Sequence, residues 1–543
     1  MSLNVRSDDN NYNKRALAFI SLNALVWWVL FSLGRSSLDT YGDMAEAYSW
    51  GISWQWGYDK HPPLSAWTAA AWFELFPISD WAYYLLAMVN QAIAFWFVFL
   101  AGKRWLTPAQ ALLAVMLTSL IPLFGPDTGF KFNANSAMLP WVAMFSWSVM
   151  AALQSGARRY VVVAGIAAGA ACLVKYWAPV MLSAITLGAL LIVYRSRPLI
   201  WRPILGKLLT VSGLSMLVFV PHFSWAMTHH WPGMHYAHAA HNLVTGSSGA
   251  ASTFDLLSDL MLVALLPTLA WAASSIYVRM ASNRGAVWVK AHGPADMQPR
   301  PNLFHGASIF IFAVLLTAES AHLAGVAVAS KWLIPAWLFF AWSLCTAVPQ
   351  AQDAPRLIRP LAWIIGLYWL GLFAYVAYIN PSFELHLDAG NERHAVADDV
   401  TQVFHREFGQ PLRFIAGNDA LSFSTAFYST DHPVAVANMD FVRTSWVNEA
   451  KVHEAGVAVL CDSSEPECIK TTVDRLGPPQ FSREWQGLAD DGKPASVLEL
   501  FYAPRAMAND WLPELPFKLA NLVAAIPNMV THEHYTQAMH AGI

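Results

Sequence analysis

The chain has 543 residues, of which 56% are hydrophobic and only 13% are charged, and its mean hydropathy is +0.37. This composition excludes a soluble globular protein of such length and indicates a polytopic membrane protein. The net charge of −3, without a basic stripe that carries interleaved aromatic residues, gives no indication that the protein binds nucleic acid.

Eleven apolar segments before residue 380 are candidate membrane spans, because a bilayer core of about 30 Å needs about 20 apolar residues per helix. They cover approximately residues 16–34, 80–101, 107–124, 136–153, 160–174, 178–194, 208–226, 256–278, 304–320, 332–349 and 361–379. With a cytoplasmic N-terminus, the cytoplasmic loops collect most of the Lys and Arg residues of this region, as the positive-inside bias requires. The opposite side then holds only Arg35, Lys60, Lys131, Lys175 and Lys331. An odd number of spans places everything after residue 379 outside.

The first external segment, residues 35–79, is rich in ionisable and aromatic residues. Its sequence DMAEAYSWGISWQWGYDKHPPL runs from Asp43 to Leu64. Ionisable groups are costly next to a membrane, so a cluster of them there indicates a functional site. The Trp and Tyr residues favour short helices lying in the membrane interface, and Pro62 and Pro63 are expected to end one of them.

Asp43 and Glu46 are the candidate catalytic residues. Their spacing of three places both carboxylates on one helix face, where one of them could act as general base on an acceptor hydroxyl. The alternative is an interfacial acidic pair that caps a helix or pairs with Lys60. His61 could bind a sugar, assist a proton transfer, ligate a metal or fix the loop against a carboxylate.

Four external lysines are candidates for binding a phosphate. Lys60, Lys131, Lys175 and Lys331 occur in the aromatic sequences YDKHPPL, GFKFNANS, LVKYW and ASKWLIP. A lysine at a span end can act as a point-charge phosphate ligand, or it can extend its ammonium group toward lipid headgroups. Tyr58 and Tyr176 accompany Lys60 and Lys175 as candidate substrate contacts.

Asn133 and Asn135 offer neutral donors and acceptors that suit sugar hydroxyls, or they could satisfy backbone groups at the start of a helix. A histidine group follows at His229, His230, His235, His238 and His241. Its spacing matches no strong zinc motif, which favours interfacial structure or substrate contact, with His235 as the substrate candidate. Carboxylates and histidines are available for a divalent metal ion, but no motif specifies a metal or another cofactor.

From about residue 381 the composition becomes that of a soluble domain. A helical stretch over residues 391–408 precedes apolar runs at residues 412–416, 434–437, 457–461 and 497–502. These runs predict a small α/β domain within residues 381–543, after a membrane module of residues 1–380. Cys461 and Cys468 lie in this exported region, where oxidising conditions permit a disulfide that sequence alone leaves open. The tail over residues 512–530 is amphipathic and is expected to lie on the membrane or on the domain.

Several motifs together resemble one known family. They are the segment DMAEAYSWGISWQWGYDKHPPLSAW, followed by KFNANS, LVKYW, VPHFSW and KWLIP. In these motifs, over roughly residues 15–380, the chain resembles bacterial glycosyltransferase family 39. Those enzymes have the GT-C fold and are related to protein O-mannosyltransferases and to the aminoarabinose transferase that modifies lipid A.

The resemblance implies a periplasmic enzyme of the bacterial inner membrane that transfers a sugar, with inversion, from a polyprenyl-phosphate donor. It also implies that an acidic residue of the first external loop is the base. Many relatives have an adjacent Asp-Glu pair, whereas here Asp43 lies three residues before Glu46. The role of base falls best on Asp43, and Glu46 is then a second acidic residue positioned to contact the donor, the acceptor or a metal. The choice between the two as base stays open.

The mechanism that follows is attack by an acceptor hydroxyl on the anomeric carbon of the sugar. Asp43 deprotonates the hydroxyl, while Lys60, Lys131 or Lys175 stabilises the departing lipid phosphate. The expected partners are the sugar donor, membrane lipids and a lipid or glycan acceptor such as lipid A or core oligosaccharide. The competing hypothesis is a transporter or flippase for a lipid-linked or anionic substrate, because buried charge also marks substrate pathways. Transporters tend to show paired halves, which this sequence does not.

Overall fold

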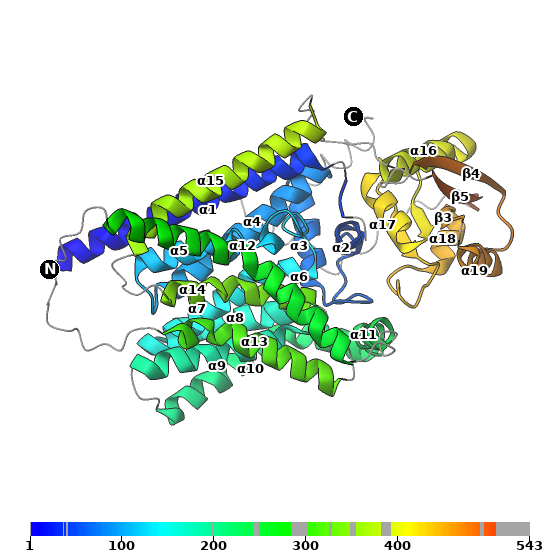
Figure 1. The fold of residues 1–543 in the computed structure, drawn as a ribbon. Helices are drawn as coiled ribbons and strands as arrows, with labels where there is room; N and C mark the ends of the chain where they lie inside the picture. Colours follow the sequence, from blue (N-terminus) through cyan, green and yellow to red (C-terminus); the bar gives the residue numbers. More distant parts are fainter. Residues whose placement is uncertain are drawn as a thin grey trace, which may run out of the picture.

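The computed structural model describes residues 2–35, 37–39, 42–196, 200–242, 249–283, 302–324, 328, 330–347, 354–381, 392–463, 465–488 and 494–505. The expected amphipathic tail at residues 512–530 lies outside this range. Within it the chain forms a large helical bundle followed by a small α/β domain (Figure 1). This architecture confirms the predicted fold class.

The first part of the chain contains a long helix followed by two short helices, which lie within residues 35–79. These are α1 (Ser2–Gly34), α2 (Asp43–Gly51) and α3 (Leu64–Phe73). The expected short helices of this segment are confirmed, but the expectation that Pro62 and Pro63 end one of them is wrong. Pro63 instead stands at the N-cap of α3, because proline lacks an N–H and is tolerated where a helix begins.

The remainder of the bundle comprises α4 (Asp80–Gly102), α5 (Pro108–Thr118), η1 (Pro122–Phe124), α6 (Ala134–Ala137), α7 (Leu139–Ser155), α8 (Arg158–Val174), α9 (Ala178–Ser196), α10 (Trp201–Thr228), α11 (Pro232–Asn242), α12 (Gly249–Asn283), α13 (Leu303–Leu323), η2 (Ser330–Phe339), α14 (Ala341–Thr346) and α15 (Ala354–Ile379). Helices α1 and α15 lie side by side, and α7 packs against α4, α8 and α9 (Figure 1). Their shared interior forms the larger hydrophobic core.

Eight helices within the described residues are long and apolar enough to cross a membrane. The predicted multi-pass membrane protein is thus confirmed. Three expected spans, at residues 107–124, 160–174 and 332–349, form the shorter helices α5, α8 and the pair η2 and α14. The count of eleven spans therefore stays a prediction.

The second part of the chain contains a five-stranded sheet in the order β2-β1-β3-β5-β4. Its elements are α16 (Glu392–Phe408), β1 (Phe414–Gly417), α17 (Asp419–Tyr428), β2 (Val434–Ala437), α18 (Glu449–Ala455), β3 (Val457–Asp462), α19 (Pro466–Leu476), β4 (Phe481–Leu488) and β5 (Pro494–Tyr502). Strands β2, β1 and β3 are parallel, whereas β5 and β4 run antiparallel. Cys461 of β3 and Cys468 of α19 form a disulfide, which the sequence left open.

Strand β4 has no counterpart among the apolar runs predicted from sequence. It is an edge strand whose sequence FSREWQGL includes two charged residues. Edge strands tolerate charge because one of their sides has no neighbour. Arg483 of β4 donates to Glu499 of β5 at 2.7 Å, so its charge is balanced within the sheet.

The α/β domain packs on the first external segment through aromatic side chains. Helix α17 lies against α2, and both lie between the sheet and the membrane bundle (Figure 1). The ring of Phe427 meets Tyr48 at 5.2 Å, and the ring of Trp446 meets Tyr58 at 5.3 Å. Aromatic pairs of this kind bury large apolar areas in preferred orientations. The domain therefore holds the segment that carries the candidate catalytic residues.

The close contact between α2 and α3 can be tested at Gly51. A Cβ atom added at Gly51 would lie 2.3 Å from the carbonyl oxygen of Ala66 and 2.9 Å from the Cβ of Ala70. We expect Gly51→Ala to destabilise the protein by about 1–3 kcal/mol, because the two helices must separate. The matched control is Gly213→Ala, at a position with nothing within 4 Å. Thermal unfolding in detergent measures both, and equal melting temperatures would contradict the predicted contact.

Candidate active site

The start of α2 is fixed by a buried aspartate that the sequence analysis missed. Asp39 is 0% exposed, and its carboxylate accepts the backbone N–H groups of Asp43 at 3.1 Å and Met44 at 2.9 Å. These groups have no partner within the helix, so the Asp39 side chain caps α2. An Asp a few residues before a predicted helix is a capping signal that could have identified it.

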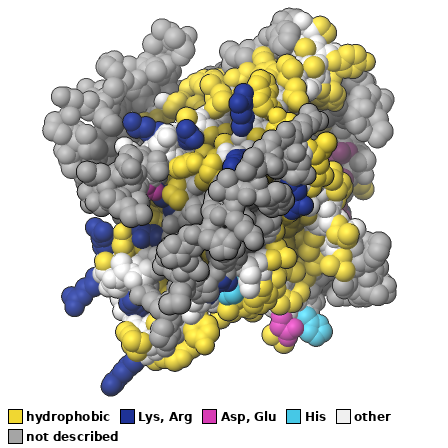
Figure 2. Space-filling model, turned by 60° about the vertical axis from the view of Figure 1, so that its left-hand side comes forward, with side chains coloured by type: hydrophobic (Ala, Val, Ile, Leu, Met, Phe, Trp, Pro, Cys, Tyr) yellow, Lys and Arg dark blue, Asp and Glu magenta, His cyan; other side chains and the backbone are white. Residues whose placement is uncertain are grey.

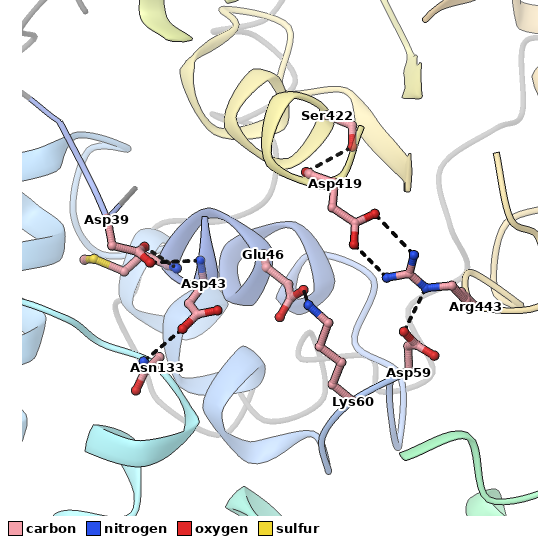
Figure 3. A network of polar contacts seen from close by, with 10 residues as sticks. Asp39, Asp43, Glu46, Asp59, Lys60, Asn133, Asp419, Ser422 and Arg443 are labelled. Atoms are coloured by element: carbon pink, nitrogen blue, oxygen red, sulfur yellow. Dashed lines mark hydrogen bonds and ion pairs between the residues drawn. The ribbon is translucent and has the colours of Figure 1, made fainter. Parts of the chain in front are cut away.

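Asp39 also has a nearby cation, since Lys131 Nζ lies 3.9 Å from its Oδ2 atom. Burial and the neighbouring charge of Asp43 raise the pKa of Asp39, while the two backbone N–H groups and Lys131 oppose that shift. The arrangement orients α2 so that the side chain of Asp43 faces the short helix α6 (Figure 3).

Asn133 connects α6 to Asp43. Its side-chain oxygen accepts the N–H groups of Asn135 at 3.0 Å and Ser136 at 3.2 Å, which caps α6. Its amide group donates to Asp43 Oδ2 at 3.2 Å (Figure 3). The side chain therefore satisfies the helix start, one of the two interpretations that the sequence left open, and also contacts the candidate base.

A cavity of about 380 Å³ opens beside these residues. Six of the predicted site residues line it, namely Asp43, Lys60, Lys131, Asn133, Asn135 and Lys331. Apolar side chains of Ala87, Leu123, Phe124, Leu139 and Ile334 line it as well. The wall thus combines one carboxylate, three ammonium groups and an apolar surface.

Two polar residues of α4 and an aromatic residue of α11 join this wall without having been singled out from sequence. Asn90 donates to the carbonyl of Ser136 at 2.8 Å, and Gln91 donates to the carbonyl of Phe124 at 3.0 Å. Tyr236 places its ring 5.4 Å from Lys60 Nζ. Asn90 and Gln91 fall within an apolar span of the sequence, where a lone amide gives no signal of which side it faces.

Glu46 does not line the cavity but forms an ion pair with Lys60, which does (Figure 3). Burial disfavours the charge of Lys60, but the carboxylate of Glu46 outweighs burial, so the pKa of Lys60 is raised. Burial also raises the pKa of Glu46, and Lys60 opposes that shift. Pairing with Lys60 was one alternative for Glu46, and it fixes the direction in which the Lys60 ammonium group points.

Lys175 lies behind the cavity wall. Its ammonium group donates to Asn135 Oδ1, and Asn135 lines the cavity. Burial and the charge of Lys331 lower the pKa of Lys175 to about 7, against the opposing effect of Asp43. Lys331 itself is exposed. The four predicted lysines therefore converge on one region, three in the wall and one behind it.

The remaining predicted substrate contacts do not line this cavity. Tyr58 is 0% exposed and stacks on Trp50 at 5.2 Å between ring centroids, whereas His235 is exposed on α11. His61 is half-buried, and burial together with Lys175 and Lys60 lowers its pKa to about 3. Tyr176 has its hydroxyl 3.0 Å from His222 Nε2. For these four residues, substrate contact stays a prediction.

Within the described residues, no group of three or more His, Cys, Asp or Glu side chains is placed to hold a metal ion. The side chains of His238 and His241 lie outside that range. The residues that line the cavity offer proton transfer at a carboxylate beside cations that can hold an anion.

Comparison with known proteins identifies a family model that matches part of the chain. A family model described as dolichyl-phosphate-mannose-protein mannosyltransferase matches residues 60–225, which include Lys60, Lys131 and Lys175. No curated protein sequence matches the chain.

Two solved structures have the same fold. The crystal structure of ArnT from Cupriavidus metallidurans bound to undecaprenyl phosphate matches with a TM-score of 0.54 at 14% identity, covering 89% of this chain and 97% of that chain. The apo structure of the same protein matches with a TM-score of 0.52 at 15% identity and the same coverage. The expected resemblance is confirmed: this chain is a multi-pass membrane protein with the GT-C glycosyltransferase fold.

Proposed function

We propose that this protein is an inverting glycosyltransferase that moves a sugar from a polyprenyl-phosphate donor to a cell-envelope acceptor. The observation that carries the proposal is the single cavity in which Asp43, three lysines and an apolar surface meet. A lipid-linked sugar phosphate has three parts that match these features: a sugar carbon that an acceptor hydroxyl can attack, an anionic phosphate and an apolar chain. The ArnT structure that shares the fold was obtained with undecaprenyl phosphate, which supports a donor of this class.

In the proposed reaction Asp43 accepts the proton of an acceptor hydroxyl. The acceptor oxygen forms a bond to the anomeric carbon while the bond from that carbon to the phosphate oxygen breaks. The electron pair of the broken bond leaves with the polyprenyl phosphate. Lys60, Lys131 and Lys331 stabilise the charge that develops there, and such stabilisation is largest where water is excluded.

We place the site at the periplasmic face of the bacterial inner membrane, with lipid A, core oligosaccharide or another envelope glycan as acceptor. Helix α4 begins near the site and α8 ends there, so Lys103, Arg104, Arg158 and Arg159 lie at the opposite end of the bundle. The face in Figure 2 accordingly shows many Lys and Arg and few acidic side chains. This asymmetry favours a cytoplasmic location for that end, and a disulfide in the α/β domain suits an oxidising compartment.

The base assignment is tested by Asp43→Asn. We expect transfer to fall by about 10²–10⁴-fold, because the amide cannot accept the proton, while binding of polyprenyl phosphate persists. The matched control is Glu46→Gln. Glu46 does not line the cavity and contacts it only through Lys60, so this substitution should reduce turnover less. An in vitro assay of sugar release from the donor measures both variants. Near wild-type turnover for Asp43→Asn would refute the assignment.

The phosphate role of Lys131 is tested by Lys131→Ala. We expect the KM for the donor to rise about tenfold, the size of one charge-assisted hydrogen bond, with little change in acceptor specificity. Arg158→Ala removes an exposed cation at the far end of α8 and should leave the KM unchanged. An unchanged donor dependence in Lys131→Ala would count against the role.

The lowered pKa of Lys175, about 7, predicts a pH effect on donor binding. The ammonium charge is present below that pH and is lost as pH rises through it, so wild-type affinity for polyprenyl phosphate should fall between pH 6 and 8.5. The variant Lys175→Arg keeps its charge over this range. Its affinity should therefore fall about fivefold less than the affinity of the wild type. Both proteins bind the same ligand, so ionisation of the phosphate cancels in the comparison. Parallel pH profiles would contradict the prediction.

A further inference from the structure

One arginine of the α/β domain joins that domain to the first external segment. Arg443 Nε donates to Asp59 Oδ2 at 2.8 Å, and its two terminal nitrogens donate to Asp419 at 3.2 Å and 2.9 Å (Figure 3). The guanidinium group thus uses both of its edges, one on the carboxylate of each part of the chain. Planar bidentate pairing of this kind has a defined geometry as well as a favourable energy.

The loop that carries Arg443 is itself held in place. Asp440 Oδ1 accepts the backbone N–H groups of Val442 at 2.8 Å and Arg443 at 3.2 Å. The side chain of Arg443 is only 22% exposed and that of Asp59 only 12%. Burial disfavours the guanidinium charge, but Asp419 and Asp59 outweigh it and raise the pKa of Arg443. The contact is therefore a shielded, fixed ion pair.

Asp59 immediately precedes Lys60, whose ammonium group lines the cavity and pairs with Glu46. Lys60 is consequently fixed at two points. Glu46 of α2 orients the end of its side chain, and Arg443 holds the backbone next to it through Asp59 (Figure 3). The second of these contacts comes from residues almost four hundred positions later in the chain.

We propose that Arg443 is a positioning residue for the phosphate site and acts through Lys60. The α/β domain then contributes to donor binding without touching the donor. This inference rests on the proposed function, because Lys60 has a phosphate to bind only if the cavity takes a polyprenyl phosphate. It differs from a general role in domain docking, which would not depend on Lys60.

The test is a double-mutant cycle on the purified full-length protein, with undecaprenyl phosphate as the probe and its dissociation constant as the readout. We expect Arg443→Ala and Lys60→Ala each to weaken binding about tenfold. The double variant should bind like Lys60→Ala alone, because Arg443 has nothing left to position. The milder variant Asp59→Asn removes the charge from the same contact and should also weaken binding. It replaces Arg443→Ala in the cycle if that variant does not fold.

The control is Tyr428→Phe. Tyr428 also joins the two parts of the chain, because its hydroxyl donates to Asp80 at 2.9 Å and accepts the N–H of Leu38 at 3.1 Å. These hydrogen bonds do not involve Asp59 or Lys60. It should lower the melting temperature while leaving the dissociation constant unchanged.

Additive losses from Arg443→Ala and Lys60→Ala, or an unaffected Lys60→Ala, would overturn the positioning role while leaving the proposed function in place. Wild-type protein that does not bind undecaprenyl phosphate would overturn both. Equal weakening by Tyr428→Phe and Arg443→Ala would reduce Arg443 to a docking contact.

Discussion

The candidate site depends on the cap that Asp39 provides at the start of α2. A buried carboxylate is costly unless its oxygens are satisfied, and here they accept the N–H groups of Asp43 and Met44 beside Lys131. Asp39 therefore satisfies the free N–H groups at the start of α2 and orients the helix so that Asp43 faces Asn133. It also lies beside Lys131, a candidate phosphate ligand in the cavity wall. A change at Asp39 would be felt at each of these points.

The charged residues in and just behind the cavity wall are held by neutral or oppositely charged neighbours. Asn133 orients Asp43, Glu46 orients Lys60, and Asn135 receives Lys175. Such supporting contacts restrict the rotamers of the reacting groups before a substrate arrives, which reduces the reorganisation needed during reaction. The supporting residues belong to the short helices α2 and α6, whereas the apolar part of the wall comes from α4, η1, α7 and η2.

Most of the fold class could be predicted from sequence, because apolar length and periodicity are local properties. The helix of residues 391–408 and four of the strands were found in this way, and Asp43, Lys60, Lys131, Asn133, Asn135 and Lys331 do meet at one cavity. Strand β4 was missed because Arg483 and Glu484 interrupt its apolar pattern, and only the folded sheet brings Glu499 beside Arg483. The stacking of Tyr58 on Trp50 could not be predicted, because an aromatic ring in a polar segment gives no sign of which ring it packs against.

The sequence by itself determined that the chain is a polytopic membrane protein whose candidate site charges are concentrated in a few motifs, because composition and spacing decide membrane insertion and helix faces. Tertiary structure alone decided which of those charges share a cavity, since that depends on how α2, α6 and η2 approach one another across the bundle. It also decided that Arg443 reaches Asp59. No local pattern links these two residues, because their contact exists only once the α/β domain has packed its aromatic side chains on the first external segment.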